Sequence, residues 1–422
     1  MNTFNNLEKK IAVFLGNFPK IKFFLKKLYQ KINFIFYNKN ISFNLDSNMV
    51  INKISISNQE SFFGYYGASP LNSSSEHLIF HSTKHRTINK PDKLKPIDIV
   101  LFDFTNSRPI NRFETFAYNW QQGSKLTWID QNHFIFNDYD KFKDLYISKI
   151  VDIRKRKIQK IIDYPIYDVK SSIGLSVSFD RLHHCEPDYG YRNKKHRIDI
   201  SNNKDDGIFL IDLESNDSKL IISIEEVINL HYKKSMNNAK HWINHIIFSP
   251  DGNRFIFIHR WSNKGKRFDS LFVYNFNTES IKCIADDDMV SHCCWKNNEE
   301  IIVFKRSYKL GDKYFTLNLE TDLERTFSNA KMNTFGDGHP TVCNKKMLFD
   351  TYPDKSRIKH LMSFNIKNNN LQNIGSFFEN FDYYGETRCD LHPRWSFDGS
   401  KIFVDSVHTG KRFLYKIEKK SQ

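Results

Sequence analysis

The chain has 422 residues, 40% of them hydrophobic, and a formal net charge of +15 at pH 7. This length leaves either several ordinary domains or one large repeat fold. The positive charge predicts an anionic partner such as an acidic polysaccharide, a nucleic acid or a membrane surface. A composition rich in Lys, Asn, Ile and Phe explains the charge equally well without any partner. No stretch reaches the roughly 18 consecutive apolar residues that a membrane span needs.

The six cysteines are the residues at 185, 283, 293, 294, 343 and 389. They form no CxxC pair and no spacing typical of a secreted disulfide framework. We therefore expect reduced cysteines and a cytoplasmic protein, with a peripheral position at the inner membrane surface as the alternative.

Residues 1–45 differ from the rest of the chain, because lysines interrupt the apolar residues every few positions. This pattern excludes an uninterrupted signal-peptide core. Pro19 is expected to divide the stretch into two short helical segments. The pattern predicts a basic amphipathic helix in which residues 1–40 bind an anionic membrane, or else a helix packed on the remaining chain or on a partner protein. The residues that carry this pattern are Phe23, Phe24, Leu28, Ile32 and Phe36, with Lys22, Lys26, Lys27 and Lys31 between them.

A repeat follows, in which two β-rich segments surround a polar turn. Such a unit is typical of the outer hairpin of a propeller blade. Six copies lie at 98–113, 144–161, 207–222, 271–284, 314–327 and 360–374. A seventh unit begins at His392 and lacks a fourth strand, which the lone segment 49–57 can supply. We predict an all-β, seven-bladed β-propeller over residues 46–422, closed by strand 49–57 and preceded by the helical extension 1–45.

Four histidines occupy one register of this repeat. They are spaced 47, 47 and 53 residues apart, and an apolar residue follows each one three positions later. Because residues at one register of successive blades face the same axis, the four imidazoles are expected to converge on one site. Metal ligation, proton transfer and neutralisation of a carboxylate all remain open. The histidines are His245, His292, His339 and His392, and Ser69 and Lys125 take the same register in blades one and two.

A long insertion at 180–206 interrupts blade three, and such an insertion is typical of a functional face. Its aromatic and basic side chains suit sugar stacking and the bidentate grip of a carboxylate. We expect it to border the histidine site, which should carry few carboxylates. The further candidates for substrate binding are His184 in the insertion and Arg260, Arg388 and Arg394 near the starts or ends of inner strands.

The segments SPDGNRFIF and HPRWSFDGSKIFVDSVHTGKRFLYKI resemble TolB/WD-like propeller repeats. The segments NHIIFSP, SHCCW, GDGHPTV and HPRWSFDG, together with DRLHHCEPDYGY in the insertion, are similar to the propeller polysaccharide lyases of the oligogalacturonate lyase type. The resemblance covers residues 60–418. Cys389 and Arg394 stand where that family has a glutamine and a second histidine of its metal cluster.

The resemblance implies β-elimination at a uronic acid, and thus a carbon–oxygen lyase acting on an acidic, bacterial surface (capsule) polysaccharide. It implies His245 and Tyr189 or Tyr191 as proton-transfer residues, with Arg181 neutralising the carboxylate beside Arg388. It implies that a divalent metal, Mn or Ca, is held by His292, His339 and His392, with no other cofactor.

Two other functions remain open. One is a non-catalytic propeller that binds a polysaccharide intermediate or scaffolds its assembly enzymes. The other is a general protein-interaction propeller, which predicts that the four histidines do not converge. We expect no nucleic-acid partner in any of these cases.

Overall fold

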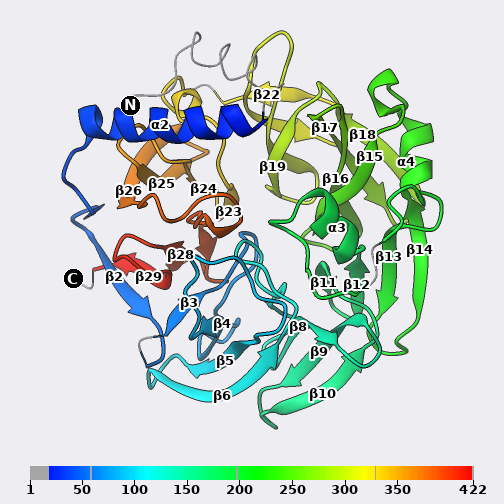
Figure 1. Cartoon of the computed structure of the whole chain (residues 1–422), viewed down its shortest axis with the longest axis horizontal. Helices are drawn as coiled ribbons and strands as arrows, with labels where there is room; N and C mark the ends of the chain where they lie inside the picture. Colours follow the sequence, from blue (N-terminus) through cyan, green and yellow to red (C-terminus); the bar gives the residue numbers. More distant parts are fainter. Residues whose placement is uncertain (1–18, 58, 196–197, 328, 421–422) are drawn as a thin grey trace.

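The computed structural model describes residues 19–57, 59–195, 198–327 and 329–420. Seven antiparallel sheets surround one axis, so the fold is a seven-bladed β-propeller (Figure 1). Alternating apolar residues on these strands pack each sheet against its neighbours, and the buried apolar clusters therefore lie between and within blades. The prediction of an all-β, seven-bladed propeller is confirmed.

Each blade is a meander that runs from the axis outward. The first three blades comprise β3 (Glu60–Phe62), β4 (His77–Thr83), β5 (Ile97–Asp103) and β6 (Arg108–Thr115); β7 (Thr127–Trp128), β8 (His133–Asp140), β9 (Leu145–Asp152) and β10 (Lys157–Ile162); and β11 (Asp168–Lys170), β12 (Ile173–Ser176), β13 (Gly207–Asp212) and β14 (Ser218–Ser223). The next two comprise β15 (Lys240–Phe248), β16 (Arg254–Asn263), β17 (Lys266–Asn275) and β18 (Ser280–Ala285); and β19 (Val290–Trp295), β20 (Glu300–Lys305), β21 (Lys313–Asn318) and β22 (Glu324–Thr326). Blade six contains β23 (Thr341–Cys343), β24 (Lys346–Asp350), β25 (Ile358–Asn365) and β26 (Asn370–Phe378), and blade seven contains β27 (Arg394–Trp395), β28 (Lys401–Ser406) and β29 (Phe413–Lys419).

The ring is closed in blade seven, where a strand from the N-terminal part of the chain pairs with the last strand. Strand β2 (Met49–Ile54) is the outermost strand of blade seven and pairs antiparallel with β29, from Met49 opposite Lys419 to Ile54 opposite Leu414. Blade seven thereby gains its fourth strand, and the hydrogen-bonding edge of β29 is covered.

The meander gives the ring two distinct faces. We call turn face the one that carries the turns from first to second strands, such as 249–253 between β15 and β16. We call loop face the opposite one, which carries the connections from second to third strands and from each blade to the next. The blade-three insertion, between β12 and β13, belongs to the loop face.

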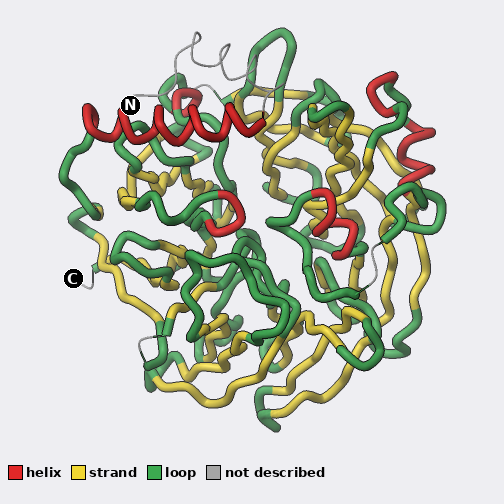
Figure 2. Tube along the Cα trace, viewed as in Figure 1, coloured by secondary structure: helices red, strands yellow, loops and turns green. Residues whose placement is uncertain are grey.

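The N-terminal segment lies on the loop face of blade six. One helix, α2 (Pro19–Tyr37), begins at Pro19, because proline is tolerated in a helix's first turn. The first of the two helical segments predicted on either side of Pro19 lies outside the described residues. The Phe34 ring contacts Phe378 and Phe381, with ring centroids 5.7 and 5.5 Å apart. Figure 2 shows the helix running across this part of the ring. None of the described helices is long and apolar enough to span a membrane.

A short strand, β1 (Phe43–Leu45), follows the helix and pairs with β26 as a fifth strand of blade six. The propeller therefore includes residues that were assigned to the extension 1–45. Residues 1–18, and the side chains of Lys22, Phe23 and Phe24, lie outside what the structure describes.

The remaining helical segments are short connections on the loop face. They are α3 (Phe179–Cys185) inside the insertion, α4 (Ile224–Leu230) after blade three, and single 3₁₀ turns at Lys234–Met236, Met332–Thr334 and Gly385–Thr387.

Candidate functional site

The four register histidines converge on the propeller axis. The ring centroids of His245 and His292 are 5.4 Å apart, those of His292 and His339 4.1 Å, and those of His339 and His392 4.2 Å. All four side chains are buried. The protein-interaction hypothesis predicted that they would not converge, and the structure contradicts it on this point.

The backbone turns these side chains toward the axis. His245 has a φ of 52° and His392 a φ of 45°, which is the left-handed region that residues other than glycine rarely adopt. The pairing of β15 with β16 shifts between Asn244 and Ile247, so His245 lies in a β-bulge. A bulge adds one residue to a strand and redirects its side chain. Lys125 in blade two has the same conformation, with a φ of 55°.

Blade one contributes a loop in place of a histidine. After β3 the chain leaves the sheet and returns to it only at the bridge between Leu71 and Leu78. The loop between them inserts Tyr65 and Tyr66 among the imidazoles: the Tyr65 ring lies 5.4 Å from that of His245 and 5.1 Å from that of His392. Sequence reasoning missed this loop. Its signal is FGYYG, two tyrosines between glycines at the blade-one register.

Arg394 and Asp405 hold the tyrosine loop in place. The Arg394 guanidinium donates to Asp405 Oδ2 at 2.7 Å and to the backbone oxygens of Gly64 and Tyr65. The Asp405 carboxylate also accepts from the Gly64 backbone N–H at 3.1 Å. Gly64 has a φ of 115°, and a side chain there would collide with Gln122. Arg394, which was predicted to bind substrate, is buried with its guanidinium bonded to this loop.

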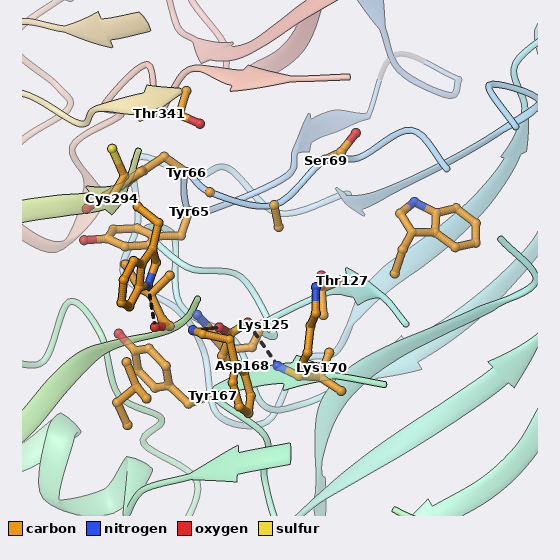
Figure 3. Close-up of a pocket in the computed structure, with 18 of the residues that line it drawn as sticks. Tyr65, Tyr66, Ser69, Lys125, Thr127, Tyr167, Asp168, Lys170, Cys294 and Thr341 are labelled. Atoms are coloured by element: carbon orange, nitrogen blue, oxygen red, sulfur yellow. Dashed lines mark hydrogen bonds between the residues drawn. The ribbon is translucent and has the colours of Figure 1, made fainter. Parts of the chain in front are cut away.

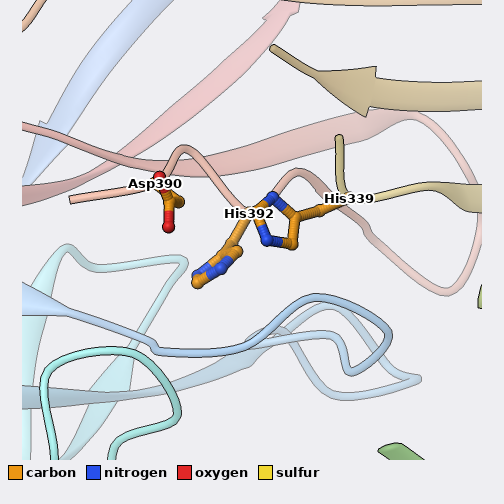
Figure 4. Close-up of side chains that lie close together, drawn as sticks. All are labelled: His339, Asp390 and His392. Carbon is orange, nitrogen blue, oxygen red and sulfur yellow. The ribbon is translucent and has the colours of Figure 1, made fainter. Parts of the chain in front are cut away.

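The imidazoles of His339 and His392 lie close together (Figure 4). His339 donates from Nδ1 to Asp350 Oδ1 at 2.8 Å, and His392 donates from Nδ1 to the Gly64 oxygen at 2.9 Å. Within the described chain, neither buried Nε2 atom has a hydrogen-bond partner. When Nδ1 carries the proton and donates it to an oxygen, Nε2 keeps a free lone pair. This is the usual arrangement of a metal-binding histidine.

Carboxylates surround this end of the histidine cluster. His292 Nδ1 lies 3.1 Å from Asp337 Oδ1, and His339, Asp390 and His392 place one ligand atom each within 4.8 Å of one another. Asp390 also accepts from Lys359 at 3.1 Å. The expectation of few carboxylates is wrong: buried imidazoles that keep a fixed tautomer need acceptors, and the protein supplies carboxylates.

The carboxylates also set how the imidazoles titrate. Burial holds the pKa of His392 well below its ordinary value, and His339 lowers it further. For His339 itself burial acts in the same direction, but the ion pair with Asp350 outweighs it and the pKa is raised. The cluster therefore combines imidazoles that stay neutral with one that holds a proton more readily.

His245 differs from the other three because both of its nitrogens are engaged. Its Nδ1 donates to Asn244 Oδ1 at 2.8 Å, and its Nε2 accepts a short hydrogen bond from the Tyr65 hydroxyl. Asn244 is fixed in turn by Arg260, whose Nε donates to the same oxygen at 3.0 Å, and by Glu186 Oε2 at 2.6 Å. This chain of contacts is a hydroxyl, a base and a residue that orients the base.

A cavity of about 450 Å³ reaches this pair from the turn face (Figure 3). We call it the Lys125 cavity. Its walls combine cationic, anionic, hydroxyl and aromatic side chains, which include Lys125, Lys170, Asp130, Asp168, Tyr65, Tyr66, Tyr167, His245, Trp128, Trp295 and Phe397. None of the described residues of the insertion 180–206 lines it.

Lys125 is the cation nearest the tyrosines. Its Nζ lies 4.0 Å from the centroid of the Tyr167 ring and 5.8 Å from that of Tyr65. Burial lowers the pKa of Lys125 to about 8, with Asp168 opposing the shift. Burial also raises the pKa of Asp168, whose carboxylate accepts the Phe248 backbone N–H at 2.8 Å.

Three other predicted residues lie on the loop-face side of the cluster. The Tyr189 ring is 5.8 Å from that of His245, and Arg388 NH2 lies 3.4 Å from the Tyr189 hydroxyl. Arg388 forms ion pairs with Asp188 and Asp390, and Arg260 forms one with Asp269 at 3.3 Å. These guanidinium charges are already balanced by carboxylates.

The insertion places its other predicted residues elsewhere. The Arg181 guanidinium is buried beside Asp206, with Nε–Oδ2 2.5 Å, and donates to backbone oxygens of the insertion and of β15. Tyr191 stacks on Phe179, with centroids 4.4 Å apart, inside the apolar core. The prediction that Arg181 and Tyr191 border the histidine site is therefore wrong. His184 is exposed on α3.

Comparison with known proteins shows similarity of fold and not of sequence. No family model matches the chain, and no curated protein matches it in sequence. The structure is similar to an oligogalacturonate lyase from Vibrio parahaemolyticus, with a TM-score of 0.60 at 12% identity over 89% of this chain and 96% of that chain. It also matches an oligogalacturonate lyase in complex with manganese, with a TM-score of 0.38 at 10% identity over 91% of this chain and 98% of that one. A third match is the β-propeller domain of the Trilobed protease from Pyrococcus furiosus, with a TM-score of 0.48 at 10% identity over 86% of this chain and 95% of that one. The chain is therefore a seven-bladed propeller that resembles oligogalacturonate lyase in structure.

Proposed function

We propose that the protein binds a uronate-containing sugar chain in the Lys125 cavity and cleaves it by β-elimination. The observation that carries this proposal is the hydrogen bond from Tyr65 to His245 at the wall of a cavity that also holds Lys125. A hydroxyl, its base and a cation within one cavity are the groups that this reaction needs.

Each group has a defined task in the elimination. The Lys125 ammonium pairs with the sugar carboxylate and stabilises the charge that develops when C5 loses its proton. That proton passes to the Tyr65 oxygen as the Tyr65 proton moves to His245 Nε2. The C4–O bond breaks as the C4–C5 double bond forms, and the same pair returns a proton to the leaving C4 oxygen. Asn244 keeps His245 in the tautomer that can accept.

The remaining walls of the cavity favour a sugar over other anions. Trp128, Trp295 and Phe397 line it, and flat aromatic faces pack well against pyranose rings. Lys170 adds a second cation on the same wall. An acidic oligosaccharide has both surfaces, apolar ring faces and carboxylates.

We further propose that His292, His339 and His392 hold a divalent metal ion. The two unsatisfied Nε2 atoms support this, as does the carboxylate beside each Nδ1 of His292 and His339. A set dominated by imidazole favours a transition metal over calcium. Such an ion would supply fixed positive charge beside Tyr65 and Tyr66 on the propeller axis.

The test is turnover of oligogalacturonate and of other uronate polymers, followed by the ultraviolet absorbance of the unsaturated product. We expect product from the wild type and almost none from Tyr65→Phe, which keeps the ring and removes only the hydroxyl. Absence of both product and binding in the wild type, with and without added manganese, would contradict the proposal.

One observation favours a second function, a propeller that binds an acidic polysaccharide without cleaving it. The buried rings of Tyr65 and Tyr66 stand between the Lys125 cavity and the other histidines, and burial raises the pKa of Tyr65 well above its ordinary value. This function predicts wild-type binding without product, and unchanged binding by Tyr65→Phe.

A further inference from the structure

Exposed apolar side chains gather on the loop face. In blades one, two and five, the connection from the second to the third strand presents one at its tip: Leu94 is 76% exposed, Phe142 90% and Tyr308 70%. Burial against protein would normally cover such residues, and a cluster of them marks an interaction surface.

Lysines flank each of these tips. The local sequences are Lys-Leu-Lys at 93–95, Lys-Phe-Lys at 141–143 and Tyr-Lys-Leu at 308–310. Lys95 and Lys143 form ion pairs with Asp92 and Asp163, at 3.6 and 3.2 Å. The exposed lysines Lys93, Lys141 and Lys309 point to a partner that is negative at its surface and apolar beneath it.

Helix α2 adds a longer apolar stripe on the same face. It contacts blade six through Phe34, and through Asn33, which is only 8% exposed. Its other side leaves exposed apolar side chains at intervals of three or four residues, which are Leu25, Leu28, Ile32, Ile35 and Phe36. Lys26, Lys31 and Lys39 are exposed beside this stripe.

The opposite face has a different surface. Its turns carry exposed Leu323, between β21 and β22, and Phe397, between β27 and β28. Neither is flanked by lysine in the sequence, since Leu323 lies between Asp322 and Glu324 and Phe397 between Ser396 and Asp398. These two turn-face tips therefore lack the flanking lysines of the three loop-face tips.

We propose that the loop face docks on an anionic lipid bilayer, with α2 and the three loop tips at the lipid surface. Apolar tips reach the boundary between head groups and acyl chains, and lysines contact the head groups. The propeller axis then stands perpendicular to the membrane, and the Lys125 cavity, on the turn face, opens away from the membrane. This inference does not depend on the proposed sugar chemistry.

The experiment is sedimentation of the full chain with vesicles of phosphatidylcholine, with and without phosphatidylglycerol. We expect binding that requires the anionic lipid and weakens as salt is added, because salt screens the attraction. Changing Lys93, Lys141 and Lys309 together to Gln should weaken binding about 100-fold, from about fivefold per lysine. The change Leu94→Ser with Phe142→Ser should weaken it in the presence of salt as well.

Leu323→Ser with Phe397→Ser is the matched control, because it removes a leucine and a phenylalanine that are exposed on the turn face. It should bind vesicles as the wild type does. Equal losses for the two double variants would overturn the proposal, and so would a wild-type protein that does not bind anionic vesicles. A wild-type dimer in sedimentation analysis that Leu94→Ser with Phe142→Ser dissociates would assign the face to a second copy of the chain, and would also overturn it.

Discussion

The two ends of the axial site, the histidine cluster and the Lys125 cavity, differ in the charge that they can accept. Toward the loop face, Asp337, Asp350 and Asp390 surround the imidazoles, and Arg388 is already paired. Toward the turn face, the Lys125 cavity has aromatic walls, two lysines and two carboxylates, Asp130 and Asp168. The first end suits a cation and the second an anion.

Tyr65 and Tyr66 form the boundary between the two ends. The Tyr65 hydroxyl bonds His245 on the cavity side, while the Tyr66 ring lies 5.4 Å from that of His339. One loop therefore separates His245, which it engages, from the three histidines that we propose as metal ligands. The lesson is that one register of a repeat can supply two chemical environments, because a neighbouring loop divides it.

The largest effect is expected where the boundary itself is changed. Tyr65→Phe and His245→Gln should each lower the turnover number by about 10²- to 10⁴-fold, the usual contribution of proton transfer. The double variant should lose little more than either single one, since both belong to one proton path. Turnover measured on the same oligouronate checks this. Additive losses would separate the two residues and contradict the pair.

The next effect concerns the anion end. Lys125→Met should weaken oligouronate binding by about 10- to 150-fold, because a hydrogen bond to a charged group contributes about 1.5–3 kcal/mol. Titration calorimetry measures the dissociation constant. Lys346→Met, an exposed lysine on the same face, should leave it unchanged. Equal effects of the two changes would mean that only overall charge matters.

The cation end should respond to metal instead. Manganese at a hundred times its dissociation constant should stabilise the wild type by about 2.7 kcal/mol, and a chelator should reverse the resulting rise in melting temperature. His339→Gln and His392→Gln should abolish the rise. His245→Gln should retain it, because its Nε2 is engaged by Tyr65. Loss of the rise in all three variants would place the metal elsewhere.

The smallest effect is a pH dependence of anion binding. The pKa of Lys125 is lowered to about 8, so the ammonium that pairs with a carboxylate is present below pH 8 and is lost as the pH rises through it. Affinity should therefore fall about twofold by pH 8 and about tenfold for each further unit. Lys125→Arg should remove the fall, since arginine stays charged. A wild-type affinity that stays constant from pH 7 to pH 9 would contradict a role of the Lys125 ammonium in anion binding.

The sequence by itself determined the architecture and the convergence of the histidines. Six copies of an outer hairpin predict blades, and a shared register predicts that His245, His292, His339 and His392 face one axis. Both are periodic properties, which depend on local alternation of side chains and can be read along one chain.

Only the tertiary structure decided what surrounds those histidines. The partner of His245 is Tyr65, 180 residues away, and Arg394 is buried against the same loop, 330 residues from Gly64. Arg181 was likewise predicted to neutralise the substrate carboxylate, but in the structure its guanidinium pairs with Asp206 and holds the insertion in place. A repeat pattern specifies the direction of a side chain but not its partner, because a buried hydrogen bond depends on which distant loop fills the space beside it.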